Sequence, residues 1–101
     1  MIYFTQLIYV KEGQEDVFDR FEEVAIPVIR KYNGQLLLRV RPGKDAFIEH
    51  HIDKPYEIHF GSFDSEQDLQ NFMRDEERKA FLHLKEQSVR ASILITGAKV
   101  G

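Results

Sequence analysis

Two segments with the same order of elements constrain the fold of this chain more than any other feature. Tyr56–Leu84 and Ile2–Lys31 each begin with alternating apolar and polar residues, turn, and continue with apolar residues at three- and four-residue spacing. Alternation is typical of a strand and the longer spacing of a helix. Further strands are expected at Gln35–Arg41 and Ala91–Thr96. The sequence therefore predicts an α+β, ferredoxin-like βαββαβ fold, with a four-stranded antiparallel sheet and two helices on one face.

The length and charge of the chain limit its organisation and its partners. A chain of 101 residues with 43% hydrophobic residues predicts a single domain, residues 1–101. A domain this small leaves much of its surface exposed, so that a partner subunit covering one apolar face would add stability, and we expect a homodimer. The net charge of −3 and the lack of a basic stripe predict no nucleic-acid partner.

Cysteine content limits the chemistry of the chain, and the N-terminal residues bear on its compartment. The chain has no cysteine, which excludes disulfides and thiolate metal sites. Met1 leads directly into a strand-like run with no signal-peptide pattern, and no stretch approaches membrane-spanning length. We expect a soluble cytoplasmic protein with no membrane partner.

The alternation within the strands predicts which side chains form the core. The expected core set is Leu36, Leu38 and Val40 in one strand and Tyr56, Ile58 and Phe60 in the next. Arg39, Arg41, Glu57 and His59 then lie on the opposite face, away from the helices.

The helical segments carry signals for their ends and for irregularities. Pro27 lies inside the first helical pattern, where we expect a kink or an early break. Ser65 is a predicted N-cap of the second helix. Asp75, at the start of a charged run, predicts that this helix breaks and is capped again.

Three runs of residues carry a family resemblance. They are IPVIRKYNGQLLLRV, with Pro27, Tyr32, Gly34, Leu37 and Arg39, then HFGSFDSEQDLQNFM and the terminal ASILITG. Together they resemble the uncharacterised family called domain of unknown function thirteen-thirty, within the dimeric α+β barrel superfamily. The resemblance implies that two subunits join the open faces of their sheets into a barrel, with the helices outside and a small cavity on the inner side of each sheet.

The sequence departs from this family at several positions. Phe72, Met73 and Arg78 stand where the family usually has aromatic residues in and after the second helix. Related antibiotic-biosynthesis and haem-degrading monooxygenases tend to use a tryptophan, and this chain has none. Fold alone does not fix function.

The candidate site is a group of polar residues on neighbouring strands. His59 is the candidate catalytic residue, and Arg39, Arg41 and Glu57 are candidate ligand-binding residues beside it, because arginines hold anions and histidine titrates near neutral pH. Tyr3 and Tyr9 share a strand face and are further candidates to line the cavity. The alternative is a structural network of ion pairs at a dimer interface or sheet rim, with the tyrosines in the core or interface.

The remaining histidines suggest metal or haem only weakly. Glu49, His50, His51 and Asp53 lie in the long connection Lys44–Pro55, but adjacent histidines on an extended chain point to opposite sides, so a solvated loop is favoured and no metal site is predicted. His83 has the position of a possible haem ligand, yet it is equally a histidine at a helix border. The sequence predicts no cofactor.

Three functions follow from these features. The first is a homodimer that binds a small anionic or aromatic molecule in the cavity. The second is a cofactor-independent monooxygenase or isomerase, with His59 as base and Arg39 or Arg41 steadying an enolate-like anion. The third is a structural or interaction protein without a small-molecule site.

Overall fold

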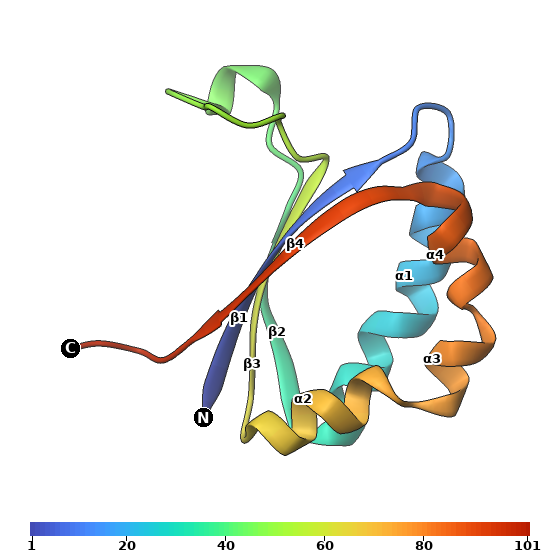
Figure 1. The fold of residues 1–101 in the computed structure, drawn as a ribbon, viewed down its shortest axis with the longest axis vertical. Coiled ribbons are helices and arrows are strands. Elements are labelled where there is room, and N and C mark those ends of the chain that lie inside the picture. Colours follow the sequence, from blue (N-terminus) through green and yellow to red (C-terminus); the bar gives the residue numbers. More distant parts are fainter.

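The computed structural model describes residues Met1–Gly101, and it has two layers, a sheet and a set of helices (Figure 1). The elements are β1 (Ile2–Val10), α1 (Glu15–Ile29), η1 (Arg30–Tyr32), β2 (Gly34–Val40), η2 (Lys44–Ala46), β3 (Glu57–Phe63), α2 (Glu66–Met73), α3 (Glu76–Ala80), α4 (Leu82–Ser88) and β4 (Val89–Gly97). The strands form one antiparallel sheet in the order β2-β3-β1-β4. The predicted ferredoxin-like α+β fold is confirmed.

Helix α1 supplies most of the helical side of the core. Glu15 and Asp16 place negative charge in its first turn, where the helix dipole favours it. Its buried apolar side chains are Val17, Phe18, Phe21, Ala25, Val28 and Ile29. The early break expected at Pro27 does not occur, since the helix continues to Ile29 and only then tightens into η1.

The second helical region is divided into α2, α3 and α4. The Ser65 hydroxyl accepts a hydrogen bond from the Asp68 backbone N–H at 3.1 Å, as expected of an N-cap. The Asp75 carboxylate accepts one from the Arg78 N–H at 2.8 Å and so caps α3. The predicted break and second cap are confirmed, and the helix that begins there, α3, lies against α1.

Strand β3 presents the opposite face to the helices from the one predicted. Glu57, His59 and Phe63 are buried on the helix-facing side, with Phe63 only 1% exposed. Phe60 lies on the other side, where its ring stacks on Tyr3 with 5.7 Å between centroids. The prediction was wrong because it placed the more hydrophobic side chains, Ile58 and Phe60, in the core. Glu57 and His59 can be buried instead because their polar groups are paired inside the molecule.

A register shift in β2 changes which of its residues face the core. Leu36 pairs with Gly61 and packs against the core as predicted, but the register shifts between Leu36 and Leu38. After this bulge Arg39 pairs with His59. Paired residues share a face, so Arg39 lies on the helix-facing side of the sheet, as His59 does. Leu38 and Val40 therefore lie on the open face, and Leu38 is 52% exposed.

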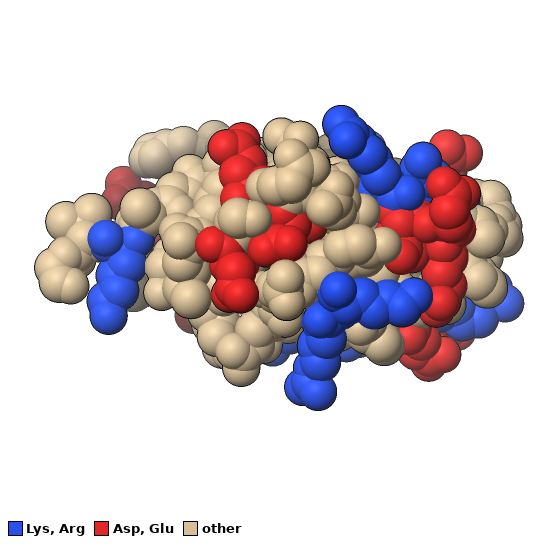
Figure 2. Space-filling view, turned by 90° about the horizontal axis from the view of Figure 1, so that it is seen from below, with Lys and Arg blue, Asp and Glu red and all other residues tan.

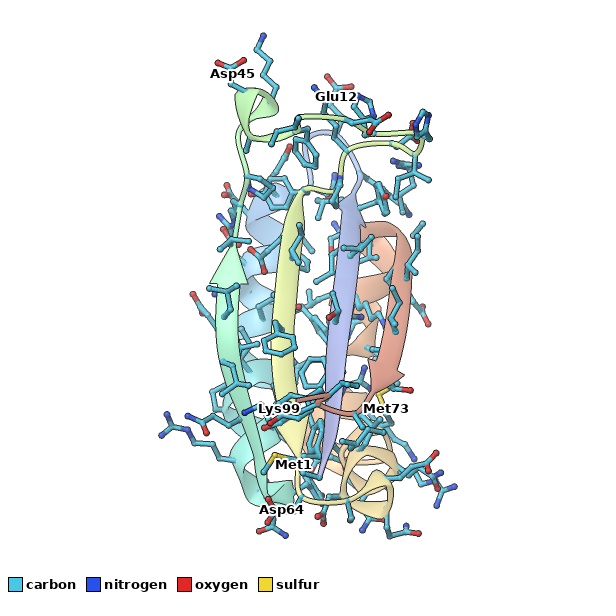
Figure 3. The ribbon with its side chains drawn as sticks, turned by 90° about the vertical axis from the view of Figure 1, so that its left-hand side faces the viewer. Met1, Glu12, Asp45, Asp64, Met73 and Lys99 are labelled. Atoms are coloured by element: carbon cyan, nitrogen blue, oxygen red, sulfur yellow. The ribbon has the colours of Figure 1, made fainter.

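The face of the sheet away from the helices is open (Figure 3). Exposed apolar side chains on it include Leu38, Ile93 and Ile95. The connection between β2 and β3 extends from one end of the sheet on this side (Figure 1). It is attached there by a hydrogen bond from the Tyr9 hydroxyl to the Asp53 carbonyl at 2.7 Å.

The surface carries mixed charge (Figure 2), and no helix is suited to span a membrane. On the face seen in Figure 2, lysines and arginines are interspersed with acidic residues and form no continuous basic patch. None of the helices has the length and apolar character needed to cross a membrane.

Candidate functional site

A cavity of about 70 Å³ lies between the sheet and the helices. Its walls are mostly apolar and include the aromatic side chains of Phe4, Phe18, Phe21, Phe63 and Phe72. It reaches the surface beside β4, where the lining residue Leu94 is 45% exposed.

Four ionisable side chains from four elements also line this cavity. They are Glu22 of α1, His59 of β3, Arg78 of α3 and Lys85 of α4. Glu22, His59 and Arg78 are 7%, 4% and 7% exposed. Buried ionisable groups that converge on an apolar cavity are typical of ligand-binding and catalytic sites.

Glu57 lies behind His59 and holds it in place. The Glu57 carboxylate is fully buried and accepts hydrogen bonds from Arg39 Nε at 2.9 Å, from Arg41 Nε at 2.6 Å and from His59 Nε2. Burial alone would raise its pKa, but the hydrogen bonds from His59, Arg39 and Arg41 outweigh burial and lower the pKa to about 2. Glu57 is therefore ionised at neutral pH.

Asp19 connects the same network to α1. Its carboxylate pairs with Arg41 and lies 3.9 Å from Arg39 Nη2. The hydrogen bond to Glu57 is the main cause that raises the pKa of Arg41. The network thus ties β2, at the edge of the sheet, to β3 and to the helix layer.

The structure separates the predicted site residues into three groups. Arg39, Arg41, Glu57 and His59 are brought together, but on the helix-facing side and not on the open face that the sequence indicated. Among these four, His59 alone lines the cavity. Tyr3 and Tyr9 lie elsewhere: Tyr3 stacks on Phe60 on the open face, and the Tyr9 hydroxyl contacts the connection.

The other histidines lie outside the cavity. His50 and His51 are exposed and make only local contacts, to the Ile52 carbonyl and to Glu49. His83 is exposed on α4, with its ring 6.3 Å from that of Phe81.

Three cavity residues were missed by the sequence analysis as site candidates. Glu22 lies four residues after Phe18 and three before Ala25, so the helical period itself places it in the middle of the apolar stripe. Arg78 was noted only as a departure from an aromatic position. Nothing in the sequence around Lys85 distinguishes it from an ordinary surface lysine.

Burial changes the protonation equilibria of these groups. It raises the pKa of Glu22, and it lowers the pKa values of Arg78 and Lys85. The ionised forms of all three are thus disfavoured by the cavity itself. A ligand of opposite charge, or a proton transfer, would relieve this cost.

One group of residues has spacing suited to a metal ion. Potential ligand atoms of Glu22, Glu57 and His59 all lie within 4.8 Å of one another. However, both oxygens of Glu57 already accept hydrogen bonds from Arg39 and Arg41, whose positive charges compete with a cation. The Glu57 carboxylate is therefore better suited to hold His59 by a hydrogen bond than to bind a metal ion.

Comparisons with known proteins identify the fold. No family model and no curated protein sequence matches the chain. A protein of unknown function from Rhodopseudomonas palustris has a similar structure, with a TM-score of 0.82, 12% identity and coverage of 99% of this chain and 82% of that one. An uncharacterized NIPSNAP domain protein from Burkholderia xenovorans has a TM-score of 0.70 and 8% identity, with 99% and 95% coverage.

A further similar structure carries an enzyme name. It is a protein from Nitrosomonas europaea named for antibiotic biosynthesis monooxygenases, with a TM-score of 0.75, 8% identity and full coverage of both chains. At such identities the likeness concerns the fold. The chain shares its ferredoxin-like α+β fold with these proteins.

Proposed function

We propose that this chain forms a homodimer and binds a small anionic or aromatic molecule in the cavity between the sheet and the helices. The observation that carries this proposal is the convergence of Glu22, His59, Arg78 and Lys85 on an otherwise apolar cavity. A plain structural core would not place four ionisable side chains from four elements around one space, because each loses hydration there.

The homodimer is supported by the open face of the sheet. Leu38, Ile93 and Ile95 expose 52%, 41% and 55% of their surface on that face. A contiguous apolar sheet face of this kind is typical of a surface that another protein covers. The opening beside β4 adjoins the same region, so a second subunit would also restrict access to the cavity.

Thermal-shift screening with small carboxylates and phenols tests ligand binding. A ligand of the cavity raises the melting temperature of the wild type, and this shift is lost in His59→Ala. His83→Ala is the matched control, since His83 is exposed and lies outside the cavity. Absence of a shift with every compound contradicts the proposal and favours a structural protein. An equal shift in His59→Ala contradicts binding in this cavity.

A second candidate function is proton-transfer catalysis, and the pairing of His59 with Glu57 favours it. An ionised carboxylate only accepts hydrogen bonds, so His59 Nε2 carries the proton toward Glu57 and Nδ1 keeps its lone pair in the neutral ring. Nδ1 would take a proton from a carbon beside a carbonyl and return it at another carbon, as in an isomerase. In a cofactor-independent monooxygenase, dioxygen would instead oxidise the resulting carbanion.

The cations suited to steady the carbanion differ from those predicted. Arg39 and Arg41 are engaged by Glu57, whereas Arg78 and Lys85 line the cavity. The catalytic candidate predicts that the wild type exchanges the protons beside the carbonyl of 2-oxobutyrate with D₂O, as followed by proton NMR. His59→Gln should lose this exchange, while His83→Gln should keep it. Exchange that is equal in both variants would count against catalysis by His59.

A further inference from the structure

Arg78 is a buried cation that has two acidic neighbours, Glu22 and Asp75, but forms no ion pair with either. Its side chain is 7% exposed, takes part in none of the ion pairs of the molecule, and has no hydrogen-bond partner at Nε. Its guanidinium donates from Nη1 to the Met73 carbonyl at 3.3 Å and lies 5.2 Å from the centre of the Phe72 ring. These contacts leave most of its hydrogen-bonding capacity unused.

The buried acidic residue that caps α3 is occupied elsewhere. Asp75 accepts hydrogen bonds from the backbone N–H of Arg78 at 2.8 Å and from the Tyr32 hydroxyl at 2.6 Å. Its carboxylate therefore fixes the start of α3 and forms no ion pair with the Arg78 guanidinium.

Lys85 adds a second cation to the same cavity. It lies on α4, is partly buried, and takes part in none of the ion pairs of the molecule either. Among the side chains that line the cavity, Glu22 is the one carboxylate against these two cations. The lining thus carries an excess of positive charge among mostly apolar walls, and the lower local dielectric strengthens the attraction for an anion.

We propose that Arg78 and Lys85 bind the carboxylate of a small organic acid whose apolar part lies against the aromatic walls of the cavity. This inference rests on the proposed function and names the ligand class of the same site. A planar guanidinium matches a carboxylate with paired hydrogen bonds, and Nε is a donor still available for one of them. The volume of about 70 Å³ restricts the enclosed part of the ligand to a few carbon atoms.

Butyrate and butyramide are suitable probes, because they have nearly the same size and shape and differ in charge. NMR titration of the wild type should give a dissociation constant for butyrate about tenfold lower than that for butyramide. Arg78→Gln should weaken butyrate binding about tenfold and leave butyramide binding within about twofold of the wild type. Arg74→Gln is the matched control, since Arg74 lies at the end of α2, is exposed and does not line the cavity.

The outcomes separate this inference from the proposed function. Equal binding of butyrate and butyramide to the wild type overturns the carboxylate site and leaves the binding cavity standing. Binding of neither probe contradicts both. Should Arg78→Gln fail to fold, Lys85→Gln provides the second test: it should weaken butyrate about fivefold with butyramide unchanged, and an unchanged butyrate affinity would overturn the inference.

Discussion

Glu57 is a buried carboxylate stabilised by three donors, so its ionisation is linked to folding. Its pKa falls from the ordinary 4.5 to about 2 in the folded protein. The unfolded chain therefore binds more protons between these values, and the stabilisation that is present above about pH 4.5 is lost as the pH falls toward 2. We expect the free energy of unfolding to drop by about 2–3 kcal/mol across this window.

Urea denaturation at a series of pH values measures this effect. Glu57→Gln should lower stability at neutral pH by roughly 3 kcal/mol, because two arginines lose their buried partner, and should flatten the dependence between pH 4.5 and 2. Glu49→Gln, at an exposed site in the connection, should leave both quantities unchanged. A Glu57→Gln profile with the wild-type slope would show that this carboxylate is not the linked group.

The positions of individual side chains were the hardest property to predict from the sequence. In β3, hydrophobicity favours Ile58 and Phe60 for the core, yet Phe63 has the same parity as Glu57 and His59 and brings both inward. The charge pairs that make this possible come from β2 and α1, far away in sequence. Local alternation carries no information about such partners.

At the scale of elements, the close approach of β1, β2 and β3 depends on Gly61. A Cβ atom at this position would meet the Phe4 ring and would lie 2.7 Å from the Gln35 carbonyl oxygen. Gly61→Ala should therefore destabilise the protein by about 1–3 kcal/mol, as measured by chemical denaturation. Gly97→Ala in β4 is the matched control, because nothing lies within 4 Å of its Cβ position. Equal stability of the two variants would contradict this account of the packing.

Element ends were predictable where a local motif defines them, and irregularities within elements were not. Ser65 and Asp75 were recognised as caps because capping requires only a side chain and a nearby backbone N–H. The bulge between Leu36 and Leu38 depends on how β2 pairs with β3. It reverses the faces of half the strand, and no residue in that stretch signals it.

At the scale of the whole molecule, the exposed apolar face of the sheet predicts association. Ile95→Glu places a charge on that face, on the edge strand β4, and we expect it to convert a dimer into a monomer in light scattering at micromolar concentration. Ile48→Glu is the control, because Ile48 is fully exposed in the connection and away from the sheet. A monomeric wild type would contradict the proposed homodimer.

The overall topology was the most predictable property of the chain. Strand β1 begins at Ile2, where the first strand–helix segment was predicted to begin, and the order of elements follows from the two repeated segments. The position of the cavity was not predictable, since it depends on Glu22, Arg78 and Lys85 meeting His59 from separate helices. Long-range convergence of this kind has no local pattern in sequence.

The cavity beside His59 is proposed to bind a small molecule, and the ring signals of the four histidines test this binding directly. In an NMR titration with butyrate, we predict a saturable shift of the His59 ring signals, because His59 alone among the histidines lines the cavity. His50, His51 and His83 are exposed and serve as internal controls that should not move. An unmoved His59, or equal shifts of all four histidines, would contradict the proposal.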